Sequence, residues 1–123
     1  MPVRIRDKLR LQGSVTPTSL NSETNVISLG DQTDDYIVEG YIDLSNMASD
    51  DKVVIKVYVA VDGTNRRLSD VKEFAGAQSI PVVRVLAHTL AYNSKFRVTI
   101  TQTAGSTLKS FPYSFVVEIM EVI

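Results

Sequence analysis

Residues 111–119, FPYSFVVEI, carry a large apolar side chain at every odd-numbered position, and this alternation indicates a β-strand. A period of two places the odd-numbered side chains on one face of an extended strand, whereas a helix would spread them around its axis. Apolar residues also occur on the other face, so we expect this strand to lie centrally in a sheet. The odd positions are Phe111, Tyr113, Phe115, Val117 and Ile119, and the additional apolar positions are Val116, Met120 and Val122.

Residues 95–102, KFRVTITQ, alternate in the same way, with Phe96, Val98 and Ile100 on the apolar side. A turn-forming segment at 103–106 follows, so residues 95–102 and 111–119 are predicted to form a β-hairpin. A second hairpin is predicted between residues 36–44 and the valine-rich residues 52–61, which the polar segment 45–51 connects. Its apolar positions are Tyr36, Val38, Ile42 and Leu44 on one strand and Val53, Ile55, Val57, Val59 and Val61 on the other.

The remaining segments complete the predicted fold. Residues 80–86 predict a strand with Pro81 near its start, where a missing N–H is tolerated, and residues 26–29 predict a short strand. Residues 66–78 fit either a short helical turn or an irregular strand. Seven or eight short strands without a long helix predict an all-β fold, a single-domain antiparallel β-sandwich of jelly-roll-like or immunoglobulin-like type.

Composition limits the class of protein. A length of 123 residues, of which 44% are hydrophobic and 22% charged, is typical of one globular core. The chain has no cysteine, which excludes disulfides and thiolate metal sites, and its net charge of −1 gives no basis for long-range attraction to nucleic acid or an anionic membrane. The first residues lack the apolar segment of a secretory signal, so we expect cytoplasmic synthesis without a signal peptide.

The first twelve residues have the most regular alternation in the chain and the opposite charge to the segment after them. They carry four basic residues and one acid, whereas residues 13–51 carry eight acids and no lysine or arginine. We divide the chain into an N-terminal strand or arm (1–12), a polar loop (13–25) and the sandwich core (26–123), all within one domain. The predicted interface with another copy or a protein partner has an apolar side of Val3, Ile5, Leu9 and Leu11 and a charged side of Arg4, Arg6, Lys8 and Arg10. A solvated edge strand and a phosphate-binding stripe are the alternatives.

Residues capable of chemistry are sparse. The single histidine, His88, has no evident catalytic or metal-binding partners, and we expect it to be structural or exposed. Acids at 31, 34, 35, 50 and 51 could offer oxygen ligands to calcium, but their spacing does not match the helix–loop–helix site, and we expect solvated loop residues. The five tyrosines (Tyr36, Tyr41, Tyr58, Tyr92 and Tyr113) could form a stacking platform, although tyrosine also fits half-buried strands. Without a nucleophile elbow, phosphate-binding loop or dinucleotide fingerprint, we expect no catalysis, cofactor or metal.

These features predict a structural or assembly protein. The arm at 2–12, the Thr/Ser-rich loop at 15–24 and a C-terminal strand that runs to Ile123 resemble, in general architecture, the small cysteine-free β-sandwich proteins of virus particles, such as capsid decoration or minor head proteins. The resemblance implies a location in the virion and, as partners, other copies of the chain or a larger protein assembly. From the net charge and the absence of an apolar segment of membrane-spanning length, we expect no membrane partner and do not favour nucleic acid. The alternative is a module that binds a carbohydrate or small ligand on a sheet face or loop end.

Overall fold

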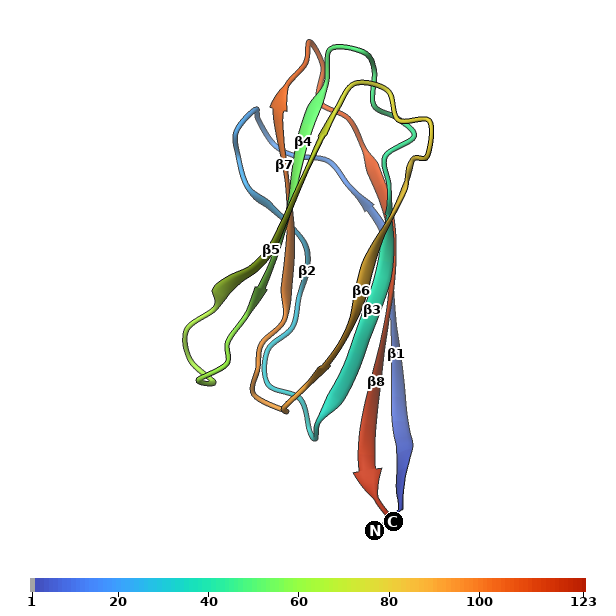
Figure 1. The fold of residues 1–123 in the computed structure, drawn as a ribbon, viewed down its shortest axis with the longest axis vertical. Coiled ribbons are helices and arrows are strands. Elements are labelled where there is room, and N and C mark those ends of the chain that lie inside the picture. The colour runs from blue at the N-terminus through green and yellow to red at the C-terminus, as the bar shows by residue number, and fades with distance from the viewer. Residues whose placement is uncertain (1) are drawn as a thin grey trace.

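A computed structural model describes residues 2–123, which form two four-stranded antiparallel sheets and no helix (Figure 1). The order of strands is β1-β8-β3-β6 in the first sheet and β2-β7-β4-β5 in the second. The predicted all-β sandwich is therefore confirmed. The strands are β1 (Val3–Val15), β2 (Thr24–Ser28), β3 (Tyr36–Asp43), β4 (Lys52–Val59), β5 (Arg67–Ala75), β6 (Val82–Leu90), β7 (Arg97–Ala104) and β8 (Phe111–Val122).

The connectivity is that of a jelly roll. The antiparallel pairs β1–β8, β2–β7, β3–β6 and β4–β5 are nested one inside the next, as in a long hairpin that has been rolled up. Consecutive strands consequently lie in opposite sheets, with β4 and β5 as the exception. Of the two sandwich types left open by the sequence, this order matches the jelly roll.

Both predicted hairpins are wrong, because each pair of segments is divided between the two sheets. β3 and β4 belong to different sheets, and so do β7 and β8. Alternation determines which face of a strand is apolar, but it does not determine the hydrogen-bonded partner. The central position of β8 is confirmed, since this strand pairs with β1 on one side and β3 on the other.

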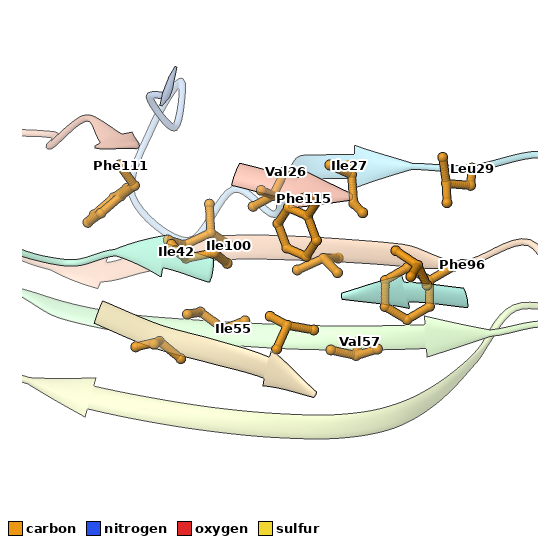
Figure 2. Close-up of a cluster of buried hydrophobic side chains, with 14 of the residues drawn as sticks. Val26, Ile27, Leu29, Ile42, Ile55, Val57, Phe96, Ile100, Phe111 and Phe115 are labelled. Carbon is orange, nitrogen blue, oxygen red and sulfur yellow. The ribbon is translucent and has the colours of Figure 1, made fainter. Parts of the chain in front are cut away.

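The core lies between the inward faces of the two sheets (Figure 2). Phe96, Phe111 and Phe115 are fully buried, as the alternation in residues 95–102 and 111–119 predicts, while Tyr113 is partly buried against the same cluster. Gly40 in β3 makes room for the Phe115 ring, because a Cβ at this position would lie 2.4 Å from Phe115 Cδ2 and 2.5 Å from the Ser114 carbonyl oxygen.

Several boundaries differ from the sequence-based prediction. β1 continues to Val15 and β2 begins at Thr24, so the first connection is shorter than the predicted loop at 13–25. Residues 66–78 contain a strand, β5, whose pairing with β4 is irregular between Val57 and Tyr58. β4 ends at Val59, which leaves Val61 in the following turn and exposed.

Candidate assembly surface

The predicted interface segment forms β1, the edge strand of its sheet. It pairs with β8 from Val3 opposite Val122 to Val15 opposite Phe111. The Ile123 N–H donates to the Pro2 carbonyl oxygen at 2.9 Å, so both ends of the chain lie together, where β1 and β8 extend past the other strands (Figure 1). The other long side of β1 is an open backbone edge.

A β-bulge in β1 corrects the predicted division of its side chains. Ile5 lies opposite Met120 and Asp7 opposite Ile119, so one extra residue is inserted between them. Directly opposite residues share a face, and the buried Val117 and Ile119 mark the inner one. Leu9 and Leu11, opposite Val117 and Phe115, therefore face inward. Val3 and Ile5 fall instead on the outer face with Lys8 and Arg10, which lie opposite Glu118 and Val116.

The outer face at this end combines exposed apolar and basic side chains. The outer β1–β8 patch consists of Val3, Ile5, Lys8, Arg10, Met120 and Val122. Val3 is 57% exposed, Ile5 51% and Val122 57%. On the inner face Leu9 is also exposed, because β2, the strand of the other sheet that lies nearest β1, has only five residues.

Two of the four basic residues of the predicted interface form ion pairs with Glu121 of the same chain. Arg4 Nη2 lies 2.6 Å from Glu121 Oε1, and Arg6 Nε lies 3.9 Å from Glu121 Oε2, while Arg6 also donates to the Thr33 hydroxyl. Among residues 2–123, none of the ion pairs includes Lys8 or Arg10. Of the four basic residues of the predicted interface, Lys8 and Arg10 are therefore the two without an ion pair in the described part of the chain.

Three acids of the segment 13–51 have partners within the same chain. Asp31 forms an ion pair with Lys95 at 2.9 Å, and Asp35 accepts a hydrogen bond from the Tyr92 N–H at 3.0 Å. Glu23 accepts hydrogen bonds from the Thr99 and Tyr58 hydroxyls at 2.6 and 2.5 Å. Burial by itself raises the pKa of Glu23, but these two hydrogen bonds, together with the charges of Arg97 and Lys56, outweigh it and leave the pKa below its usual value of 4.5.

Asp51 is not the solvated loop acid that the sequence predicted, because its side chain is fully buried. Its Oδ2 accepts a hydrogen bond from the Ala48 N–H at 2.7 Å and lies 3.1 Å from Lys109 Nζ. The Gln102 amide, also fully buried, lies 3.4 Å from Asp51 Oδ1 and donates to the Thr107 carbonyl oxygen at 2.8 Å. Gly105 makes room for this network, since a Cβ there would lie 2.1 Å from Asp51 Oδ1. The network ties the β3–β4 connection to the β7–β8 connection.

The other residues considered for chemistry are dispersed. The Tyr36 side chain is fully buried, Tyr41 and Tyr92 are half exposed, and Tyr113 packs beside Phe115. His88 lies against Phe96 with ring centroids 5.0 Å apart. Over residues 2–123, no three His, Asp or Glu side chains are grouped so that they could hold a metal ion. The described part of the chain also contains no helix that is long and apolar enough to cross a membrane.

The fold and strand order define an eight-stranded jelly-roll domain, and comparison with known proteins agrees with this class. The chain is similar to the structure of the infectious bursal disease virus VP2 subviral particle, with a TM-score of 0.51 and 12% identity over 95% of this chain. A structure of the Gx strain of the same virus aligns with a TM-score of 0.49 and 10% identity over 98% of the chain. The chain spans about a third of the length of each, 33% and 32%. At this identity the likeness concerns the fold. No protein-family model and no curated protein sequence matches.

Proposed function

We propose that this chain is a non-catalytic structural domain that assembles with other copies of itself through β1 and the outer β1–β8 patch, as a component of a virus particle. The observation that carries the proposal is the exposure of β1. Nearly all of its thirteen residues are exposed, and three of them are the large apolar residues Val3, Ile5 and Leu9. A long edge strand with apolar side chains is a template for pairing with another chain.

The energetics favour burial of this patch in an interface. Complete burial of a valine or isoleucine side chain stabilises by about 1.5–3 kcal/mol, so half-exposed Val3, Ile5 and Val122 each contribute on the order of 1 kcal/mol when covered. Hydrogen bonds to the open backbone edge add to this. Lys8 and Arg10 would mainly determine the register of the contact and the choice of partner, because exposed ion pairs add only about 0–1 kcal/mol each to the binding free energy.

The virion setting of the proposal is supported by the likeness of the fold to VP2 in a subviral particle. Jelly rolls also occur in lectins and cupins, so the fold alone does not specify the setting. A closed particle would require the β1 contact to form between symmetry-related copies.

Light scattering coupled to size exclusion tests self-assembly. We expect the unaltered protein to give a mass above the 13.6 kDa of one chain, and Ile5→Lys to return the mass to that of a monomer without change in melting temperature. Leu68→Lys is the matched control, because Leu68 is 54% exposed on β5, an edge strand of the other sheet. A monomeric mass for the unaltered protein at high concentration, or equal masses for both variants, contradicts the proposal.

A further inference from the structure

The side of the sandwich opposite β1 contains a cleft between the edge strands β5 and β6. This β5–β6 cleft has a volume of about 400 Å³, within the range of small-molecule sites. Its floor is aliphatic and belongs to the core: Ile55, Val57, Val83 and Val85. Its rim is polar on both strands, with Ser69, Asp70 and Lys72 from β5 and His88 from β6.

A β-bulge turns His88 into the cleft. His88 lies opposite Val38, and Val85 lies opposite Gly40. Two residues of β6, Leu86 and Ala87, are therefore matched by the single β3 residue Glu39. The shift places His88 on the inner face with buried Val38, whereas strict alternation from Val85 would place it outside. The His88 Nδ1 is 2.8 Å from the Leu86 carbonyl oxygen, which can only accept a hydrogen bond, so Nδ1 carries the proton. In the neutral ring Nε2 is then an acceptor.

A second bulge lies on the opposite rim. Asp70 is opposite Val57 and Leu68 opposite Tyr58, which leaves Ser69 as the inserted residue of β5. Asp70 therefore shares the inner face with buried Val57, and in residues 2–123 its carboxylate takes part in no ion pair. Lys72, also on the inner face, donates to the Arg84 carbonyl oxygen on β6 at 3.2 Å and spans the cleft.

Inward-pointing charges and bulges also protect sheet edges from aggregation. That role does not require an inward histidine on the opposite strand beside a hollow with an aliphatic floor. Bulges are over-represented next to active sites as well as at sheet edges, and in both places they re-aim side chains. The combination indicates a binding site.

We propose that the β5–β6 cleft binds a small amphiphile with an aliphatic body and an uncharged, hydroxyl-bearing head. The aliphatic floor matches the body. Asp70 would repel an anionic head, and Lys72 would repel a cationic head. Hydroxyl groups, in contrast, can donate to Asp70 and His88 Nε2 and accept from Ser69.

Three probes with the same six-carbon body separate the classes of head group: hexane-1,2-diol, hexanoate and hexylammonium. Binding is followed by NMR shifts of the Val83 and Val85 methyl groups. We expect saturable shifts with the diol and several-fold weaker binding of the two charged probes. Equal binding of all three probes, or shifts that do not saturate, overturns the proposal.

Two variants and one matched control locate the site. Asp70→Asn should weaken diol binding about tenfold, because it removes a charge-assisted hydrogen bond. Glu73→Gln, on the outer face of β5 opposite Val54, makes the same change in charge and should leave binding unaltered. Unchanged affinity in Asp70→Asn overturns the proposal. Ala87→Trp, at an exposed rim position, should block the cleft. These outcomes are independent of self-assembly through β1, which lies on the opposite side of the sandwich.

Discussion

Replacing Asp51 by alanine tests the buried network that ties the β3–β4 connection to the β7–β8 connection. Removing one partner of a buried ion pair usually costs about 3–5 kcal/mol, because the other charge is left without compensation. The Lys109 side chain is 20% exposed and keeps some access to water, so we expect a loss near the lower end, about 3 kcal/mol. The change also leaves the Ala48 N–H without its acceptor at 2.7 Å.

Urea unfolding followed by circular dichroism measures this loss directly. In a chain of this length each kcal/mol lowers the melting temperature by roughly 3–5 °C, so Asp51→Ala should melt about 10–15 °C below the unaltered protein. Asp50→Ala is the matched control, because Asp50 is exposed and its carboxylate accepts a hydrogen bond from the Ser106 N–H at 3.1 Å without forming a buried ion pair within residues 2–123. Its melting temperature should change little.

A double-mutant cycle distinguishes the ion pair from general damage to the loop. Lys109→Met in the Asp51→Ala background should recover part of the stability, since no unpaired charge then remains. If Asp51→Ala costs less than about 1 kcal/mol, or if the two changes are simply additive, the reasoning from the buried pair is refuted.

Three further predictions concern the packing of the core and the pH dependence of stability. Phe115→Ala should cost about 3–5 kcal/mol in chemical unfolding, and a loss within the range of surface mutations would show that the inward face is misassigned. Gly40→Ala should cost about 1–3 kcal/mol, because the new Cβ would meet a ring and a backbone carbonyl, whereas Gly30→Ala has nothing within 4 Å and should unfold at nearly the same urea concentration as the unaltered protein. The folded-state pKa of Glu23 is lowered, so its contribution is present above the unfolded value of 4.5 and is lost as pH falls through the folded value. Glu23→Gln should accordingly flatten the decline of melting temperature on acidification, and an unchanged decline would contradict this assignment.

The inward faces of the strands could be predicted from the sequence because they depend only on local alternation. Phe96, Val98 and Ile100 are all fully buried, as their spacing indicates. Pairing between strands depends on the path of the connections, and alternation is the same whichever strand lies alongside. The sequence therefore identified the sandwich but assigned the wrong partners to β3 and β7.

Bulges limited the prediction of the two candidate sites. One inserted residue in β1 moves Val3 and Ile5 to the face of Lys8, and an insertion in β6 moves His88 inward. Neither insertion contains a glycine or proline that would signal it in the sequence. The burial of Asp51 was missed for a different reason, because its cation comes from Lys109, far along the chain. Gly105, whose φ of +129° requires glycine, was the available sign of a close approach there.

The nested pairing of strands also bears on how the chain folds. β4 and β5 are adjacent in sequence and can pair at low cost in loop entropy, and each outer pair then closes a loop that the inner pairs have already shortened. We expect folding to proceed outward from this hairpin, in milliseconds to seconds, as for other folds dominated by distant contacts. The β1–β8 pair joins Val3 to Val122, almost the full length of the chain, and would form last. Until that step the edge of β8 is open, so the β1 strand of a second molecule could pair with β8 in place of the chain's own β1. Two molecules would then exchange their β1 strands during assembly.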